Sequence, residues 1–476
     1  MRRAIEVVDL QATGPPKLKR SLGLWMATAL VVGNMVGSGV FLLPSSLAGI
    51  GSVSLLGWLL TGTGAVLLAL VFANLGRRYP RTGGPYAYAH RAFGEFVGFE
   101  TAWGYWIAAW VGNAAIATAF VGYLAVFAPT VATNHLLGAL VALAIIWTLT
   151  FVNIAGVRQG GIVQVATTVL KFVPLLAIGV IGLFFMKGGN FHPFVAGTGG
   201  SLKGITTAAA LTLWAFIGLE SSTVPAEEVK DPERNIPRST IIGTVSTTAL
   251  YVLATIAVMG IIPMATLANS TSPFADAART IFNTAWVGKA IAVVAMISTF
   301  GALNGWILLQ GRVPLAAAQD GLFPKQFAKL SGTRHTPVFG LVVSSIGITV
   351  VTFMFYNQSL VSMFTQVILL ATLTTLVPYA FAAAAQALLF FTDRERFSGR
   401  RFAKDGTIAT LAFAYSVWAI WGSGFEIIAK GFILLLVGIP VFIFMKWRLL
   451  APKTIELREV SNNGHEDLSP IAVHTR

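Results

Sequence analysis

The chain alternates between long apolar stretches and short polar segments, and most of the apolar stretches have the length of a membrane-spanning helix. A helix needs about 20 mostly apolar residues to cross a bilayer. By this rule we predict twelve membrane spans, at residues 21–46, 52–76, 96–127, 135–153, 162–186, 205–227, 238–262, 286–318, 337–356, 360–391, 406–424 and 430–448. A polar N-terminal segment, 1–20, precedes them and a polar tail, 449–476, follows them. The pattern therefore predicts an all-α membrane protein with 12 transmembrane helices.

The composition supports a membrane protein and excludes a soluble one. Hydrophobic residues make up 55% of the chain and charged residues only 11%, whereas an average soluble domain has about 25% charged residues. The chain has no cysteine, which excludes disulfides, thiolate metal ligands and a cysteine nucleophile. It also lacks the metalloprotease, serine-hydrolase and phosphate-binding-loop motifs. We therefore expect a protein that is not an enzyme and that has no cofactor and no metal site.

The positive charges of the chain gather on one side of the predicted membrane. Of the 33 lysines and arginines, 26 fall on the side that carries both termini, 5 fall on the opposite side, and Lys171 and Arg312 lie inside spans. Cytosolic loops of membrane proteins are enriched in Lys and Arg. We therefore expect a multi-pass protein of the inner or plasma membrane with both termini in the cytosol. This bias also accounts for the net charge of +14, so the charge gives no reason to expect nucleic acid as a partner.

The first span contains three glycines within seven residues, at 33–39. Each glycine inside a helix costs about 1 kcal/mol relative to alanine, and the cluster can interrupt the helix. Unwound backbone at membrane depth is tolerated only against protein or a water-filled cavity. Its freed N–H and C=O groups suit a carboxylate and an ammonium group. A close contact between helices through small residues explains the glycines equally well.

The sixth span is the second irregular one, because Glu220 and two hydroxyl residues follow Gly218 near its middle. An acidic residue at membrane depth is by default a candidate for function, although Glu220 could instead be a structural hydrogen-bond acceptor. Each irregular span is the first of five in its half, 21–186 or 205–391. Halves of five spans run in opposite directions, which predicts a five-plus-five inverted repeat with broken helices 1 and 6. The last two spans, 406–448, lie outside the repeat.

Lys171 in the fifth span is another charge at membrane depth. Placing a lysine near the bilayer centre costs roughly 2.5 kcal/mol or more. The side chain can face the bundle and pair with carbonyl or hydroxyl groups. Alternatively, it can extend to the cytosolic interface, since it lies about nine residues into its span.

An ordered set of motifs runs through residues 21–448. Its members are GNMVGSGVFLLP at 33–44, GGPYAYA at 83–89, YW at 105–106 with GN at 112–113, LWAFIGLES at 213–221, DPERNIP at 231–237, NGW at 304–306, DGLFP at 320–324 and VPY at 377–379. This set resembles the motifs of the amino acid–polyamine–organocation transporters. Within that superfamily the chain looks most similar to the bacterial arginine/agmatine, lysine/cadaverine and putrescine/ornithine antiporters. The set is specific for the superfamily and much weaker as a guide to one substrate.

The resemblance implies the five-plus-five fold and a substrate site between spans one, three, six, eight and ten. Backbone groups for the α-carboxylate and α-amine of a substrate would come from Asn34, Met35, Gly37, Ser38 and Gly39. Side chains near the rest of the substrate or in its gates would be Tyr105, Trp214, Ile217, Trp306 and Tyr379. Glu220 would be the pH-sensitive group, with Lys171 as a second residue of the proton-coupling set. Tryptophan is a good partner for a cation, but ordinary packing is an alternative for Trp214 and Trp306.

Asn113 is a further candidate, because Tyr105, Ala109 and Asn113 lie on one side of a helix at a spacing of four residues. A buried amide needs a hydrogen-bonding partner. That partner is either the guanidinium or amine of a substrate or a neighbouring helix, and the sequence leaves both open.

Four positions depart from the arginine/agmatine pattern. Ala109, Ala302 and Ala371 stand where those antiporters carry small polar or thiol side chains, which should weaken discrimination for a guanidinium group. Lys171 stands where they carry an apolar residue. In this it is similar to the proton-coupled and neutral amino acid branches, where the ammonium is taken to occupy the place of a sodium ion. We therefore expect transport that does not depend on sodium, and a broader or different substrate than arginine alone.

The expected function is secondary active transport of amino acids or their decarboxylated amines by alternating access. A sodium-independent, proton-linked antiporter of basic amino acids is the first hypothesis. A proton-coupled symporter or a uniporter of neutral or broad-range amino acids is the second. A channel is the alternative from another class, but the sequence has no recognisable selectivity filter. The expected partners are the small-molecule substrate, protons and the lipid bilayer, and a homodimer is left open.

Overall fold

The computed structural model describes residues 20, 22–81, 83–155, 161–196, 200–331, 336–393 and 402–450. Nearly all of the predicted tail and of the N-terminal segment therefore lies outside the described residues. Within this part of the chain the structure is helical and contains no strand, although an isolated bridge joins Leu22 to Val229. The helices are α1 (Leu24–Met35), α2 (Ser38–Ala48), α3 (Ser54–Arg78), α4 (Pro85–Phe93), α5 (Glu95–Leu124), α6 (Thr130–Thr133), α7 (His135–Ile154), α8 (Gly161–Gly182), α9 (Gly200–Leu213), α10 (Pro232–Ile261), α11 (Met264–Leu267), α12 (Pro273–Phe282), α13 (Ala285–Gln319), α14 (Val338–Phe355), α15 (Leu360–Thr392), α16 (Phe402–Gly422), α17 (Phe425–Leu436) and α18 (Gly438–Leu450). Short 3-10 turns lie at Leu183–Phe185, Gly188–Phe191, Trp214–Phe216 and Ala226–Glu228.

Ten stretches of the described residues are long and apolar enough to cross a membrane. They match ten of the twelve predicted spans. The sixth predicted span is not among the ten because its helix α9 stops at Leu213 and gives way to turns. The eleventh corresponds to α16, which carries Lys404 and Asp405 near its start. The helical, apolar character of the chain is thus confirmed.

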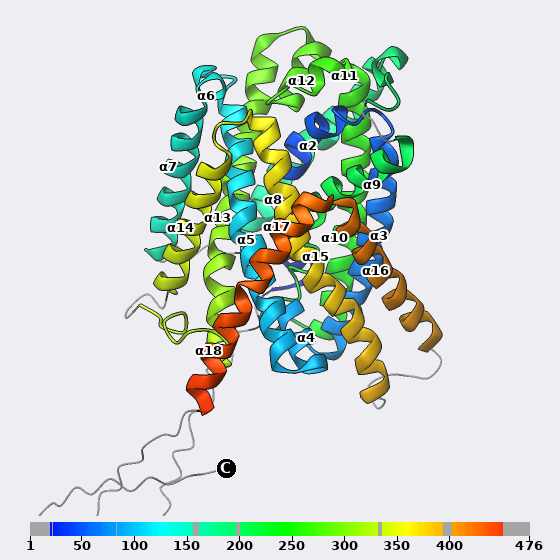
Figure 1. The fold of residues 1–476 in the computed structure, drawn as a ribbon. Coiled ribbons are helices and arrows are strands. Elements are labelled where there is room, and N and C mark those ends of the chain that lie inside the picture. Colours follow the sequence, from blue (N-terminus) through cyan, green and yellow to red (C-terminus); the bar gives the residue numbers. More distant parts are fainter. Residues whose placement is uncertain are drawn as a thin grey trace, which may run out of the picture.

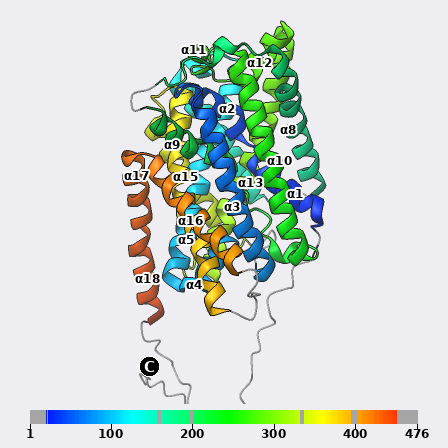
Figure 2. The ribbon, with the colours of Figure 1, turned by 90° about the vertical axis from the view of Figure 1, so that its right-hand side faces the viewer.

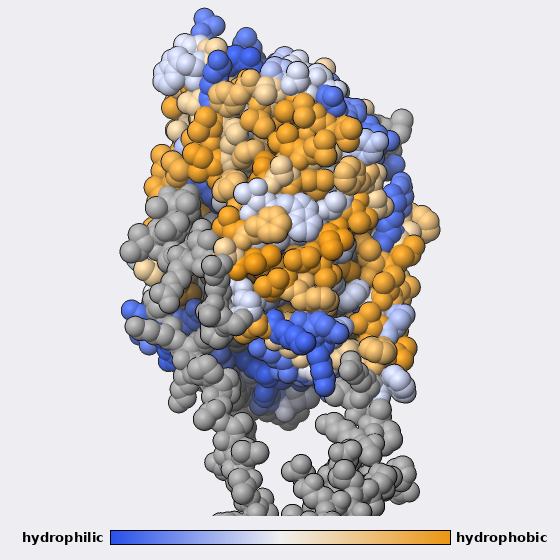
Figure 3. Space-filling model, turned by 90° about the vertical axis from the view of Figure 1, so that its left-hand side faces the viewer, coloured by the Kyte–Doolittle hydropathy of each residue, from blue (hydrophilic) through white to orange (hydrophobic). Residues whose placement is uncertain are grey.

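The outer surface of the helix bundle is apolar over a broad band. Figure 3 shows this band on one face, with hydrophilic residues gathered towards the two ends of the molecule. Large apolar side chains, such as those of Leu59, Phe151 and Phe432, are exposed. Soluble monomers rarely expose apolar patches of this extent, whereas lipid tails can cover them. The chain is therefore a multi-pass membrane protein.

Helix α5 lies inside the bundle and packs against α13 and α15. Helices α1, α3 and α8 pack against α10 on another side. Figures 1 and 2 show α17 and α18 along the outside, α4 near one end of the bundle, and α11 and α12 at the other end.

Both predicted interruptions are present. Helix α1 ends at Met35 and α2 starts at Ser38, with Val36 and Gly37 in non-helical conformations. After α9, a 3-10 turn over Trp214–Phe216 leads into an extended residue, Ile217. Gly218 has a φ of +111°, which favours glycine because it has no Cβ. The two breaks meet, since a Cβ on Gly218 would lie 3.1 Å from the Cβ of Asn34.

Candidate functional site

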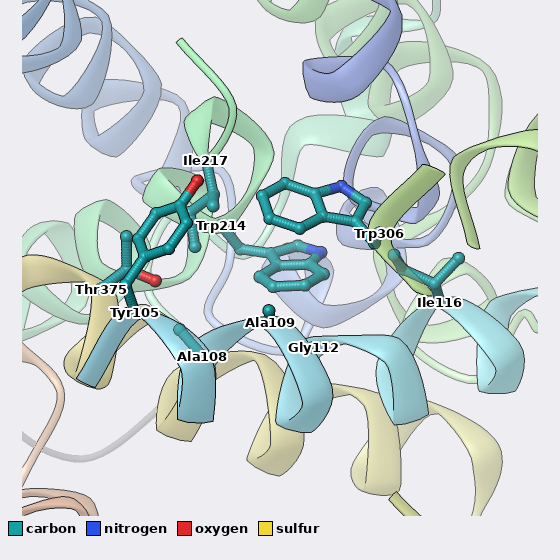
Figure 4. Close-up of a pocket in the computed structure, with 9 residues that line it drawn as sticks. All are labelled: Tyr105, Ala108, Ala109, Gly112, Ile116, Trp214, Ile217, Trp306 and Thr375. Carbon is teal, nitrogen blue, oxygen red and sulfur yellow. The ribbon is translucent and has the colours of Figure 1, made fainter. Parts of the chain in front are cut away.

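A small cavity lies beside the two breaks. Side chains from the middle of α5, from the 3-10 turn after α9, from α13 and from α15 line it, as Figure 4 shows. The free volume inside it is about 10 Å³, which is room for about one water molecule. A larger molecule therefore needs the surrounding helices to move apart. The lining residues are Tyr105, Ala108, Ala109, Gly112, Ile116, Trp214, Ile217, Trp306 and Thr375.

Two indole rings dominate this cavity. In Figure 4 the ring of Trp214 lies over α5, and the ring of Trp306 lies beyond the Trp214 ring, farther from α5. A Cβ added to Gly112 would come within 2.6 Å of the Trp214 ring, so only glycine lets this ring approach α5 so closely. The indole nitrogen of Trp214 donates to the hydroxyl of Ser38 over 3.3 Å. The aromatic faces and the start of α2 thus belong to one site.

Glu220 lies at the centre of a buried network that joins three spans. The hydroxyls of Tyr105 and Tyr379 each donate to its carboxylate, one to each oxygen, over 2.5 Å. The backbone N–H of Gly218 donates to the second oxygen over 3.1 Å. Burial of a carboxylate is tolerable when its oxygens are paired in this way. Because Tyr105 also lines the cavity, the charge of Glu220 is linked to the cavity wall by a single hydroxyl.

The residues of the first break are placed at the same site. The side chain of Asn34 donates to the hydroxyl of Ser221 over 2.8 Å. Ser38 and Gly39 begin α2, and the first N–H groups of a helix have no partner within it. A Cβ on Gly39 would lie 2.9 Å from the Cα of Ala215, which shows how closely the two broken spans pack. A helix start of this kind favours a negative group nearby.

Tyr251 is a residue that the sequence did not single out. Its hydroxyl, on α10, lies 2.6 Å from the carbonyl oxygen of Met35 and 3.1 Å from that of Ala215. These two carbonyls belong to the two different breaks. One buried hydroxyl therefore ties the unwound segments together, and no pattern near position 251 indicates this role.

Lys171 faces the bundle. Its side chain is 3% exposed, and its ammonium donates to the carbonyl oxygen of Gly33 over 3.3 Å. One turn earlier on α8, the hydroxyl of Thr168 donates to the carbonyl of Ala29. The inward position is thus the one the structure has, and the extended position at the interface is not.

Asn113 does not line the cavity but lies directly behind its wall. Its amide nitrogen donates to the side-chain oxygen of Gln310 on α13 over 2.7 Å. Its amide oxygen is buried and has no hydrogen-bond partner among the described residues. The neighbouring helix is therefore the partner of the amide nitrogen, and the amide oxygen can still accept a bond. Gln310 was not predicted, although it follows Trp306 by one helical turn.

The three alanines that depart from the arginine/agmatine pattern lie at or near the cavity. Ala109 lines it. A Cβ on Gly37 would lie 3.3 Å from Ala302, and one on Gly112 would lie 3.8 Å from Ala371. The wall is thus mostly aromatic and apolar, and Tyr105 and Thr375 are its hydroxyl-bearing residues.

Several known transporters are similar in sequence to this chain. An arginine/ornithine antiporter of Pseudomonas aeruginosa is 32% identical over 86% of this chain and 87% of its own length. A putrescine transporter of Haemophilus influenzae is 31% identical over 90% of this chain and 97% of its own length. A cadaverine/lysine antiporter of Escherichia coli is 33% identical over 69% of this chain and 74% of its own length.

The chain also matches a family model. Residues 22–449 match the model of a family described as amino acid permease. That range contains both breaks, the cavity and all ten long apolar stretches. The resemblance in the sequence motifs is thereby confirmed, and the chain belongs to the amino acid permease family.

Proposed function

We propose that this protein is a sodium-independent, proton-linked antiporter that exchanges basic amino acids or their decarboxylated amines by alternating access. The observation that carries the proposal is the small aromatic cavity beside two interrupted spans. The relatives named above, which are an arginine/ornithine antiporter, a putrescine transporter and a cadaverine/lysine antiporter, support a cationic substrate.

A cationic amino acid suits the groups around the cavity. The start of α2 at Ser38 and Gly39 would receive the α-carboxylate, because unpaired N–H groups at a helix start attract anions. Carbonyl groups of the interrupted span near Ile217 would receive the α-amine. The faces of Trp214 and Trp306 would hold the stem and the distal cation, an interaction worth about 0.5–2 kcal/mol depending on desolvation. A diamine lacks the carboxylate and would use the aromatic faces and the carbonyls.

Proton linkage is assigned to Glu220. As a carboxylate it accepts from both tyrosines, but a protonated carboxyl group must itself donate through one oxygen. Uptake of a proton would therefore weaken or reverse one of these two bonds. Where that bond is the one from Tyr105, which lines the cavity, the change alters the wall against which the substrate rests. This gives a route from proton uptake to substrate release.

Lys171 accounts for the proposed sodium independence. Its ammonium occupies the position next to the carbonyl of Gly33 and would repel a sodium ion from the same carbonyl groups. A fixed cation of this kind can support the broken span in every transport cycle. Transport would then need no sodium gradient.

The finer architecture also belongs to this proposal. It comprises twelve spans, with the two halves 21–186 and 205–391 as inverted repeats and 406–448 outside them. The interruptions at Val36–Gly37 and Trp214–Ile217 each fall in the first span of their half, which supports such a repeat. Both termini would lie in the cytosol.

Exchange in proteoliposomes tests the proposal. Purified protein is reconstituted with internal arginine, lysine, ornithine, putrescine or no substrate, and uptake of each labelled compound is measured with sodium and with choline as the external cation. We expect uptake to be faster with an internal cationic substrate and to be the same in sodium and choline. Uptake that ignores the internal substrate would point to a symporter or uniporter, and neutral amino acids as the best substrates would overturn the cationic assignment.

The Glu220→Gln variant tests the proton linkage in the same vesicles. Glutamine keeps the size of the side chain but cannot gain or lose a proton. We expect exchange to persist and its dependence on pH between 5 and 8 to flatten. A pH profile equal to that of the unmodified protein would remove Glu220 from the proton-coupling role.

A further inference from the structure

Asn113 and Gln310 form a fully buried amide pair behind the cavity wall. Both side chains are 0% exposed. On α5, Ala109 precedes Asn113 by one turn and Ile116 follows it by three residues, and both line the cavity. Residues at these spacings lie on one face of a helix. On α13, Gln310 stands one turn beyond Trp306, another residue of the lining.

A chain of hydrogen bonds fixes the direction in which this pair points. The hydroxyl of Thr150 donates to the carbonyl of Ile146 over 2.8 Å, and a hydroxyl has only one proton to give. Thr150 therefore accepts from the hydroxyl of Ser345, 2.8 Å away. Ser345, having given its proton, accepts from the amide nitrogen of Gln310 over 3.2 Å.

The consequence reaches Asn113. Because the amide nitrogen of Gln310 points to Ser345, its amide oxygen points to Asn113 and accepts a hydrogen bond from the Asn113 amide nitrogen over 2.7 Å. The amide oxygen of Asn113 is then buried and has no hydrogen-bond partner among the described residues. Buried polar atoms in native proteins nearly always have a partner. A free acceptor beside a substrate cavity is matched by a ligand that brings an N–H donor.

We propose that Gln310, held by Ser345 and Thr150, is a positioning residue that keeps the oxygen of Asn113 free and so makes the cavity select substrates with an ammonium or guanidinium group at the end of the side chain. This inference rests on the proposed function and adds a determinant of specificity that does not itself touch the substrate. If the chain were broken, both amides could turn over and leave an N–H group of Asn113 facing the cation.

The test compares ornithine with norvaline, which has the same three-carbon side chain without the ammonium group. Each compound competes with the best labelled substrate in proteoliposomes, and the ratio of their inhibitory concentrations is the readout. The variants Ser345→Ala and Gln310→Met break the chain. Gln310→Glu keeps an oxygen towards Asn113. Ser344→Ala is the matched control, because Ser344 is equally buried but bonds Trp106 and the backbone carbonyls of Gly340 and Gln310, and does not bond the side-chain amide of Gln310.

In the unmodified protein we expect a preference for ornithine of roughly tenfold or more, since a site built on polar pairing rejects the analogue that lacks the group. Ser345→Ala and Gln310→Met should lose most of that preference, while Gln310→Glu and Ser344→Ala should keep it within about threefold. For a variant that binds substrate but does not transport it, the ratio compares the concentrations of ornithine and norvaline that raise its melting temperature by the same amount. An unchanged ratio in Ser345→Ala and Gln310→Met, or no preference in the unmodified protein, would overturn the inference. Failure of the proposed function is a different result, namely no exchange of any amino acid or amine.

Discussion

Replacement of Gly112 by alanine puts the geometry of the cavity to a direct test. The added Cβ would lie 2.6 Å from one atom of the Trp214 ring and 2.9 Å from another. To restore an ordinary contact of 3.4 Å, the ring must move by about 0.8 Å, away from α5. Figure 4 shows that this direction leads towards the ring of Trp306. The cavity has little room to absorb the shift, because its free space is about that of one water molecule.

The magnitude follows from the cost of overpacking. An extra methyl group in a well-packed interior costs about 1–3 kcal/mol. If that cost falls on the conformation that holds the substrate, affinity drops roughly 5- to 150-fold, since 1.4 kcal/mol is a factor of ten. The assay is competition by unlabelled substrate against labelled uptake, with the amount of folded protein checked by size-exclusion chromatography.

Gly305→Ala is the matched control for Gly112→Ala. Gly305 stands next to Trp306, but a Cβ there would meet its nearest neighbour, the side-chain oxygen of Asn34, only at 3.8 Å. We expect this variant to keep its affinity within about threefold. Equal affinities of Gly112→Ala and the unmodified protein would refute the assignment of the Trp214 ring to the substrate site.

Three further variants test other parts of the structure. Trp214→Leu should reduce transport at least tenfold in folded protein, because it removes both the aromatic face and the bond to Ser38; near-normal uptake would exclude a binding role. Lys171→Ala should slow turnover and make it respond to sodium. If this variant turns over as fast as the unmodified protein, both in sodium and in choline, the proposed role of the ammonium is contradicted. Tyr79, beside α4, donates its hydroxyl to Asp393 over 2.8 Å, and its burial raises the pKa of Tyr79 to about 12. The bond is therefore fully present below pH 10 and is lost only as pH rises through about 12, so Tyr79→Phe should cost about 1 kcal/mol equally at pH 6 and pH 9. A melting-temperature difference that varies between these two pH values would contradict it.

Much of the fold could be predicted because its causes are local. An apolar run of about 20 residues has few alternatives to a membrane helix. The ten long apolar helices found among the described residues all lie at predicted spans. The interruptions were also visible, since the glycines at 33–39 and the acidic residue after Gly218 disturb an otherwise regular pattern. The family could be predicted from ordered motifs for the same reason. The predicted roles of the site residues remain proposals.

The partners of the buried polar groups could not be predicted, because they depend on how distant helices pack. Asn113 and Gln310 are 197 positions apart in the chain, and no pattern near either one names the other. Tyr251 bonds the carbonyls of Met35 and Ala215, which become available only because both spans are broken. The sequence shows that a buried amide needs a partner, but only the packing of α5 against α13 decides which one it has.

Access to the cavity from both sides of the membrane is the property on which a transporter of this kind depends. Because the chain has no cysteine, a single Ala109→Cys variant carries one reactive group, in the cavity lining. Ala115→Cys, buried elsewhere on α5, is the control and should stay unreactive. The rate at which membrane-impermeant thiol reagents label Ala109→Cys in vesicles of each orientation is the most direct measurement. We predict labelling from both faces that slows when the exchanged substrate is added. Labelling that occurs from neither face, or that ignores the substrate, would contradict the account.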